Sequence, residues 1–296
     1  MCTVCGCGAF NNGPTPATTG ADAGAPGRRH DHHRDDHVHD LEWHDHQHRH
    51  EHVHERTAVR GVGPGAERLV RVEQDILADN DRLAARNRTF LLEQRILGLN
   101  LMSGPGAGKT TLLVRTIEDS RGAAPISVIE GDQETSFDAE RVRSAGVRAV
   151  QINTGRGCHL DARMIGDALL SLAPSQRSVV FIENVGNLVC PAAFDLGEAA
   201  RVVLLSVTEG DDKPLKYANM FAAAQLMLVT KIDLLPFVPF DLQRCSAFAR
   251  RLNPEIEIMP VSATSGDGMD RWYAWIARRH ADLGTSRPIE IGAVGE

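Results

Sequence analysis

The sequence of 296 residues has few aromatic side chains, no long apolar run and no excess of positive charge. Aromatic residues make up 5% of the chain and the net charge is −7. Both values argue against a general nucleic-acid binder, which uses basic patches and stacks bases on aromatic rings. No apolar run reaches the roughly 18 residues that a membrane-spanning helix requires, so no membrane span is expected. Segment 1–8 has neither the basic nor the apolar part of a signal peptide, and the cytoplasm is the expected location.

Cysteine is also scarce, and three of the six cysteines lie in the first eight residues. Thiols stay reduced in the cytoplasm, so these cysteines are expected to be metal ligands, catalysts or core residues rather than disulfides. Cys2, Cys5 and Cys7 stand in a stretch that offers no core to bury them. Three thiolates and a main-chain nitrogen form a planar set that suits Ni(II) or Cu(II), whereas tetrahedral thiolate sets suit zinc. Segment 1–8 is therefore predicted to be a metal motif.

Histidine, in contrast, is concentrated in a tract at 28–55 that is rich in acids and poor in apolar residues. Such a tract buries too little apolar surface to offset its ordering entropy, so we expect disorder in the absence of metal. Imidazole is a good ligand for zinc, nickel and copper, and its binding is lost as pH falls through about 6.5. Segment 9–65, which contains the tract, is predicted to be a flexible, metal-binding linker. The tract contains His30, His32, His33, His37, His39, His44, His46, His48, His50, His52 and His54.

From residue 66 onward the pattern becomes that of an α/β domain. Apolar residues at helical spacing between Leu69 and Phe90 predict an amphipathic helix or a pair of helices. Short apolar runs then alternate with helical stretches, which indicates a mostly parallel sheet with helices on both faces. The runs are 96–101, 126–130, 149–152, 179–182, 202–207, 226–230 and 257–261.

A glycine-rich loop follows the first apolar run and opens a helical stretch. Glycines let backbone N–H groups surround a phosphate at the positive end of a helix. Lys109 is predicted to neutralise the β- and γ-phosphates, and Thr110 to place its hydroxyl on Mg²⁺. Ser103 stands where the first glycine is usual, which is tolerated if its φ is negative. The nucleotide-binding residues predicted here are Gly104, Gly106, Ala107, Gly108, Lys109, Thr110 and Thr111.

A second group of residues points to guanine as the base. The run at 226–230 ends in Thr230-Lys231-Ile232-Asp233, close to the N-K-x-D guanine motif. The carboxylate of Asp233 can accept hydrogen bonds from guanine N1–H and N2, which adenine cannot supply. Lys231 is expected to lie along the base, and Thr230, in place of asparagine, is expected to brace the loop less strongly. Ser262 and Ala263 match the segment whose backbone contacts guanine O6, so GTP is the predicted nucleotide.

Catalysis and magnesium binding are assigned to carboxylates at strand ends. Glu183 follows a buried run in an E-x-x-G pattern and is placed to reach Mg²⁺ through water. Asp132, at the end of the second run, is expected to orient the attacking water or the metal shell. Lys109, Asp132 and Glu183 are the predicted catalytic residues, and Thr110, Asp132 and Glu183 the magnesium site. Because phosphoryl transfer depends mainly on positioning and charge, a slow intrinsic hydrolysis rate is expected.

A further metal site is predicted inside the domain. Cys158 and His159 lie just past the run at 149–152, and Cys190 lies seven residues after Glu183. The two segments are expected to leave neighbouring strands and so to converge. The three side chains would form a site with open positions, and its closeness to Glu183 suggests that nucleotide state and metal occupancy are coupled.

Together these motifs resemble the hydrogenase maturation nickel-insertion GTPases, and the resemblance covers nearly the whole chain. It implies a P-loop GTPase domain at 66–296, of the class that forms homodimers across its nucleotide sites. It also implies nickel at Cys2, Cys5 and Cys7, and nickel or zinc at Cys158, His159 and Cys190. The histidine tract resembles a nickel store. The implied partners are a small nickel- and zinc-binding accessory protein and the large-subunit precursor of [NiFe]-hydrogenase. The matching segments are 2–7, 28–55, 80–87, 102–111, 130–133, 153–162, 183–191 and 212–217.

Two other hypotheses remain open. One is a nickel buffer with a vestigial GTPase, in which the tail supplies the function. The other is a urease accessory GTPase, which shares a His-rich start and an E-x-x-G-type switch. That family pairs a Cys-Pro-His motif with its metal, whereas here Cys190 and Pro191 are followed by Ala192. The sequence also departs from that family in having the cluster of Cys2, Cys5 and Cys7.

Overall fold

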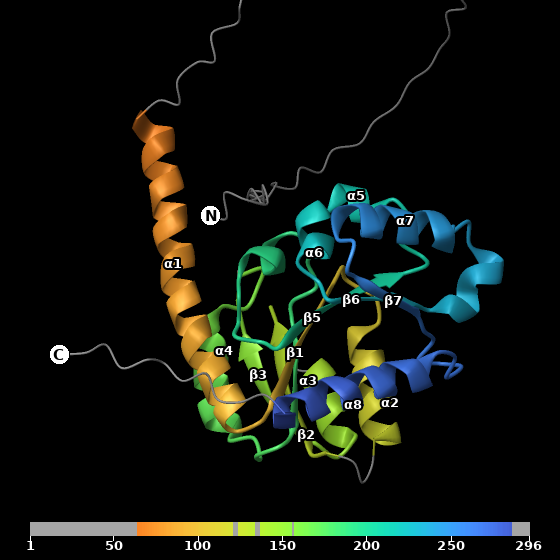
Figure 1. The fold of residues 1–296 in the computed structure, drawn as a ribbon, viewed down its shortest axis with the longest axis horizontal. Coiled ribbons are helices and arrows are strands. Elements are labelled where there is room, and N and C mark those ends of the chain that lie inside the picture. Colours follow the sequence, from red (N-terminus) through yellow and green to blue (C-terminus); the bar gives the residue numbers. More distant parts are fainter. Residues whose placement is uncertain (1–63, 121–123, 134–136, 156, 286–296) are drawn as a thin grey trace, which may run out of the picture.

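The computed structural model describes residues 64–120, 124–133, 137–155 and 157–285 (Figure 1). The predicted cysteine motif at 1–8 and the histidine tract lie outside these ranges. In the described part of the chain, none of the helices combines the length and apolar character needed to cross a bilayer.

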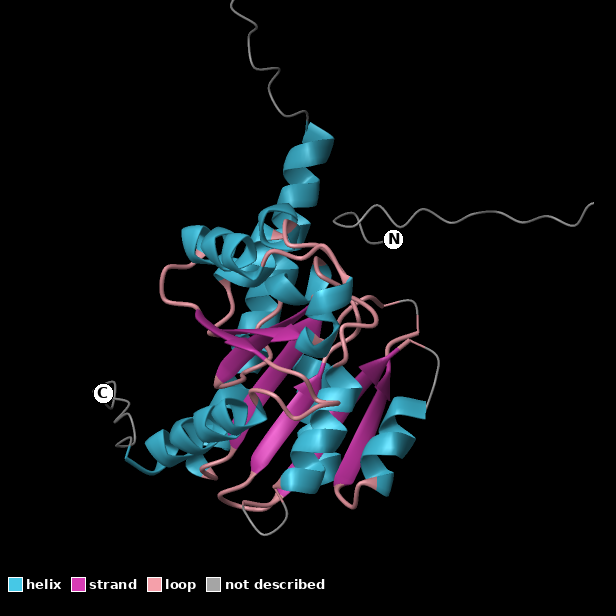
Figure 2. Ribbon diagram, turned by 90° about the vertical axis from the view of Figure 1, so that its right-hand side faces the viewer, coloured by secondary structure: helices cyan, strands magenta, loops and turns pink. Residues whose placement is uncertain are grey.

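A seven-stranded sheet forms the centre of the domain, with strand order β3-β2-β4-β1-β5-β6-β7. All of its strand pairs are parallel, as the alternating apolar runs predict (Figure 2). Each predicted run overlaps one strand. The strands are β1 Leu97–Ser103, β2 Ile126–Asp132, β3 Arg148–Asn153, β4 Val179–Glu183, β5 Ala200–Ser206, β6 Leu226–Thr230 and β7 Glu257–Pro260.

Helices cover both faces of the sheet. One face is packed by α2 Lys109–Asp119, α3 Phe137–Ser144 and α8 Met269–Thr285, the last of which buries Trp272 and Trp275. The opposite face is packed by α1 Pro64–Glu93 and α4 Ala162–Leu172 at one end. At its other end lie α6 Ala218–Ala222 and α7 Leu242–Leu252. The remaining short helices are α5 Lys213–Lys216, η1 Cys190–Ala193 and η2 Ile232–Phe237.

The predicted amphipathic segment before the first strand is one continuous helix, α1, and not a pair. It begins at Pro64, a residue suited to a first helical turn because its missing N–H would have no partner there. Ala84 and Leu91 are buried on one side of the helix, together with Asn80 and Asn87. This spacing places one face of α1 against the domain. The first turns project beyond the sheet (Figure 1).

Because every strand runs in the same direction, all carboxyl ends of the strands meet at one edge of the sheet. Ligands of open parallel sheets bind at this edge. The carboxyl ends of β1, β2, β3, β4, β6 and β7, with the segments that directly follow them, carry the site residues that the sequence predicts within the described part of the domain.

Candidate functional site

The glycine-rich loop follows β1 and turns directly into α2. Gly106 and Gly108 have φ values of 74° and 98°, in the left-handed region that favours glycine. Ser103 has a negative φ, so serine is accommodated at the position where the first glycine is usual. The Lys109 ammonium donates to Ser103 Oγ at 3.0 Å, and Ser103 Oγ donates to the carbonyl of Gly104 at 2.6 Å. The Lys109 side chain therefore folds back from the start of α2 onto the glycine loop.

Lys109 is almost buried, with 9% of its surface exposed. Burial lowers the pKa of its ammonium, and the nearby Glu183 carboxylate acts in the opposite direction. A positive charge that is desolvated and aimed into a glycine loop interacts more strongly with an anion than a charge in water would.

The T-K-x-D segment contacts the glycine loop directly. Thr230 Oγ1 donates to the carbonyl of Ala107 at 2.7 Å, and Lys231 Nζ donates to the carbonyl of Gly106 at 2.7 Å. The expected loss of bracing at Thr230 is thus offset, because its hydroxyl makes a short, buried bond to the loop. Asp233 Oδ1 accepts a hydrogen bond from Ser262 Oγ at 2.6 Å.

These segments enclose one pocket, which brings the predicted base-reading residues together. It is lined by Ala107, Gly108, Thr111, Leu112, Thr230, Lys231, Asp233, Leu234, Val261, Ser262, Ala263 and Thr264. A carboxylate at one wall and a glycine loop at the other suit a purine base joined to phosphates.

Of the carboxylates predicted to reach magnesium, Glu183 contacts the end of this loop, and Asp132 lies at the end of β2. Glu183, 3% exposed, accepts a hydrogen bond from Thr110 Oγ1 at 2.7 Å through Oε1. Asp132 Oδ1 accepts from the backbone N–H of Gln133 at 2.7 Å. Glu130, which the sequence analysis does not single out, is 2% exposed and lies opposite Glu183 in the register of β2 and β4. Within the described residues, Oε2 of Glu130 and of Glu183 has no hydrogen-bond partner. Two orphaned carboxylate oxygens beside a threonine hydroxyl are a donor set that fits a hard divalent cation.

The buried glutamates make the stability of the nucleotide- and magnesium-free protein depend on pH. Burial and the neighbouring Glu183 charge raise the pKa of Glu130 to about 8 from 4.5, and burial raises that of Glu183 to about 7. Above pH 4.5 the folded protein holds protons that the unfolded chain has released. Stability from these groups is therefore highest below pH 4.5 and falls as pH rises through about 8.

Glu130→Gln is expected to raise the melting temperature of the magnesium-free protein at pH 8.5 relative to wild type, because glutamine has no charge to bury. The difference should shrink toward pH 5, where wild-type Glu130 is protonated. Thermal unfolding in a chelator across this range measures it, with exposed Glu255→Gln as the control. A Glu130→Gln difference that stays constant from pH 5 to pH 8.5 would contradict the assignment.

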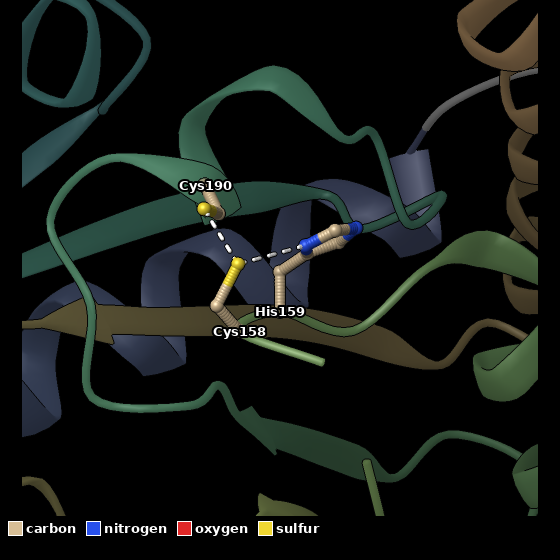
Figure 3. Close-up of side chains that lie close together, drawn as sticks. All are labelled: Cys158, His159 and Cys190. Atoms are coloured by element: carbon tan, nitrogen blue, oxygen red, sulfur yellow. Dashed lines mark hydrogen bonds between the residues drawn. The ribbon is translucent and has the colours of Figure 1, made fainter. Parts of the chain in front are cut away.

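The predicted metal ligands of the domain converge. Candidate ligand atoms of Cys158, His159 and Cys190 all lie within 4.8 Å of one another (Figure 3). The two Sγ atoms are 2.7 Å apart, and Cys158 Sγ lies 3.7 Å from His159 Nδ1. The His159 ring stacks on Phe194 with centroids 3.9 Å apart. Burial lowers the pKa of His159, which favours the neutral imidazole that binds metals.

The expected route to this convergence is wrong. Cys158 follows β3 and Cys190 follows β4, and these strands are not neighbours, because β2 pairs with both of them. The residues meet because both segments leave the same edge of the sheet and extend past the end of β2. Asn184 Oδ1 joins the two segments by accepting from the backbone N–H of Leu160 at 3.3 Å. The sequence analysis does not single out Asn184, although an asparagine directly after a buried apolar run, inside the E-x-x-G pattern, could have indicated it.

Comparison with known proteins agrees with this geometry. Residues 99–260 match the family model "CobW/HypB/UreG, nucleotide-binding domain". The Hydrogenase maturation factor HypB of Azotobacter vinelandii is 57% identical over 234 residues, which are 79% of this chain and 76% of that protein. The chain belongs to the hydrogenase maturation factor HypB family. Membership of the HypB family together with the P-loop fold makes the protein a GTPase.

Solved HypB structures share the fold. The hydrogenase maturation factor HypB from Archaeoglobus fulgidus is 40% identical and superposes with a TM-score of 0.65, covering 69% of this chain and 99% of that one. HypB from Helicobacter pylori in complex with nickel is 38% identical with the same TM-score, covering 69% and 96% of the two chains.

Proposed function

We propose that GTP hydrolysis by this protein gates the transfer of Ni²⁺ to the large-subunit precursor of [NiFe]-hydrogenase. The observation that carries the proposal is the short stretch of chain between the nucleotide site and the metal cluster. Glu183, bonded to Thr110 of the glycine loop, and Cys190, in contact with Cys158, are separated by six residues. A relative solved in complex with nickel supports nickel as the cargo.

For the nucleotide, we assign GTP to the pocket between the glycine loop and Asp233. Lys109 would bind the β- and γ-phosphates with the backbone N–H groups of residues 104–111. Asp233 would accept from guanine N1–H and N2, while the backbone at Ser262 and Ala263 would meet O6. The bond from Ser262 to Asp233 supports this, because it holds the carboxylate at the pocket wall. An adenine base would leave that carboxylate unpaired.

For hydrolysis, Mg²⁺ would be held by Thr110, Asp132 and Glu183. Glu130 would lie next to Glu183 on the neighbouring strand. Magnesium, when bound, neutralises charge on the transferred phosphoryl group. The protein residues contribute position and charge. Lys109 stabilises the phosphate oxygens, and Asp132 orients the attacking water.

For the cargo, Cys158, His159 and Cys190 would bind Ni²⁺ or Zn²⁺, because thiolates and a neutral imidazole suit both ions. Cys2, Cys5 and Cys7 are proposed as a separate nickel site, and the histidine tract as a nickel store. The partners proposed are a second copy of the chain, associating according to nucleotide and metal, and a small nickel- and zinc-binding accessory protein. The protein is proposed to act in the cytoplasm, as its sequence predicts.

A nickel-limited host that lacks its own nickel-insertion GTPase tests the function. The intact gene is expected to restore hydrogenase activity, whereas the Lys109→Ala form is expected to restore none, because it cannot hold the phosphates. Urease activity is measured in the same cells and is expected to stay unrestored.

Equal rescue of hydrogenase by both forms would instead identify the chain as a nickel store with a vestigial GTPase. In that case deletion of residues 28–55 should abolish the rescue. Rescue of urease alone would favour the urease accessory class.

A further inference from the structure

The side chain of Asn184 holds two loops with a single oxygen. Asn184 follows Glu183 at the end of β4 and is 1% exposed. Its Oδ1 accepts from the backbone N–H of Val185 at 3.0 Å and from that of Leu160 at 3.3 Å. Val185 begins the segment that leads to Cys190, and Leu160 directly follows His159. One amide oxygen therefore binds the backbone next to His159 and the first residue of the segment that leads to Cys190.

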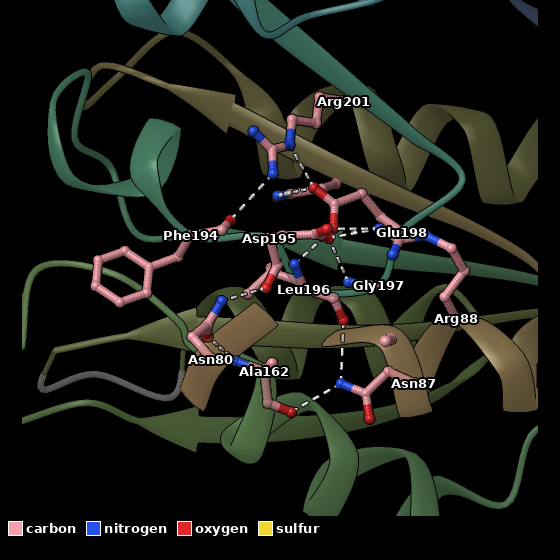
Figure 4. A network of polar contacts seen from close by, with 12 residues as sticks. Asn80, Asn87, Arg88, Ala162, Phe194, Asp195, Leu196, Gly197, Glu198 and Arg201 are labelled. Carbon is pink, nitrogen blue, oxygen red and sulfur yellow. Dashed lines mark hydrogen bonds and ion pairs between the residues drawn. The ribbon is translucent and has the colours of Figure 1, made fainter. Parts of the chain in front are cut away.

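The orientation of this amide is fixed by a buried chain of hydrogen bonds. Glu198 Oε1 accepts from Asn100 Nδ2 at 3.2 Å, so the amide oxygen of Asn100 must point away from it. That oxygen accepts from Asn184 Nδ2 at 3.2 Å, which leaves Asn184 Oδ1 for the two backbone donors. Arg201 Nε donates to Glu198 Oε1 at 2.6 Å and holds the carboxylate in place (Figure 4). Asn100 and Asn184 are both essentially buried.

The other side of Asn184 is tied to the nucleotide site. Its backbone N–H donates to the carbonyl of Leu101 on β1, the strand that leads into the glycine loop. Glu183 accepts from Thr110 at the start of α2. A shift of the Glu183 main chain when phosphates and magnesium bind would displace Asn184 too, because a planar peptide unit joins the two residues.

We propose that Asn184 is the positioning residue that couples nucleotide state to metal affinity, by passing movement of Glu183 to the loops that carry Cys158, His159 and Cys190. This inference rests on the proposed function, since it requires that nucleotide state change the metal affinity. Asn184 belongs neither to the metal cluster nor to the glycine loop, and it acts through the backbone of Leu160 and Val185.

Asn80 provides a matched control. It is a buried asparagine, 5% exposed, and it also holds the segment after His159. Its Oδ1 accepts from the N–H of Ala162 at 2.9 Å, and its Nδ2 donates to the carbonyl of Asp195 at 2.8 Å (Figure 4). These bonds tie the segment after His159, and the stretch after Cys190 at Asp195, to α1, and neither bond reaches β4 or the glycine loop. Loss of Asn80 should therefore weaken the same segment without cutting the path from Glu183.

The test measures nickel affinity of the full chain in two nucleotide states. Cys2, Cys5 and Cys7 are first changed to serine, so that the thiolate-to-nickel absorption band reports the domain site. Nickel is titrated against a competing chelator that fixes its free concentration, because the histidine tract is also proposed to take up nickel, with Mg²⁺ and either GDP or a non-hydrolysable GTP analogue present. The parent is expected to show about a 10-fold ratio between the two dissociation constants, within the usual range of allosteric coupling.

Asn184→Ala is expected to bring this ratio to within about 2-fold while GDP binding is retained, whereas Asn80→Ala should keep the parental ratio despite a lower melting temperature. Asn184→Asp, of the same size but unable to donate to Asn100, is the second variant and should give an intermediate ratio. A parental ratio in both Asn184 variants would overturn the inference. Equal nickel dissociation constants of the parent in the two nucleotide states would overturn the gating itself. This failure of the proposed function is visible before any Asn184 variant is measured.

Discussion

Lys109→Ala is expected to lower the rate of GTP hydrolysis by about 100- to 1,000-fold, the usual cost of removing one preorganised group that stabilises transition-state charge. The effect is large because Lys109 is buried at the start of α2, where its ammonium contacts Ser103 and lies in the field of Glu183. No water can replace that charge in a desolvated loop at the same position. The fold should survive, since burial already disfavours the charged form of this lysine.

Phosphate release under single-turnover conditions measures this effect. Lys216→Ala is the control, because Lys216 is exposed on α5 and pairs with Asp212 at the surface. Its hydrolysis rate should stay within about 2-fold of wild type, as a surface ion pair contributes little. A Lys109→Ala rate within about 5-fold of wild type would show that this lysine does not stabilise the transition state.

Cys158→Ser and Cys190→Ser are each expected to lower nickel affinity at the domain site by at least about 100-fold. Loss of a residue that only hydrogen-bonds to a metal ligand already lowers metal affinity by about 10- to 100-fold, and these cysteines are the ligands themselves. Serine is neutral at pH 7 and is a poor ligand for nickel, whereas thiolate is ionised by the metal. The two sulfur atoms point toward each other, so either substitution removes half of the sulfur donors.

Nickel titration in the chain with Cys2, Cys5 and Cys7 changed to serine measures this affinity through the thiolate absorption band. Cys245→Ala is the matched control. Its thiol is fully buried on the core-facing side of α7, and burial raises its pKa to about 12, so it should not bind metal. Retention of the band in both Cys158→Ser and Cys190→Ser would remove this cluster from the metal pathway.

The proposed function places two demands on the end of β4 and the segment after it. Glu183, bonded to Thr110, would sense phosphate and magnesium, and Cys190, in contact with Cys158, would hold metal. Asn184 stands between them with its side chain buried. Its position explains how a hydrolysis event at the glycine loop could change a metal site without any direct contact between nucleotide and cargo.

Much of the domain is determined by local sequence. The apolar runs predict every strand of the sheet, because a strand buried on both faces must be apolar along its length. The glycine loop is equally local, since Gly106 and Gly108 adopt a backbone conformation that few other residues tolerate. The metal predictions for residues 2–7 and for the histidine tract remain predictions from composition and resemblance.

Only the tertiary structure decided how the site is assembled. Strand order places β2 between β3 and β4, so Cys158 and Cys190 meet by loops that extend past β2, and not across adjacent strands. The same packing buries Glu130 opposite Glu183 and turns the Asn184 amide toward Leu160. These contacts join residues that lie 24 to 53 positions apart in the chain. Sequence pattern specifies which residues form each strand, but the packing of the whole sheet decides which strand ends face one another.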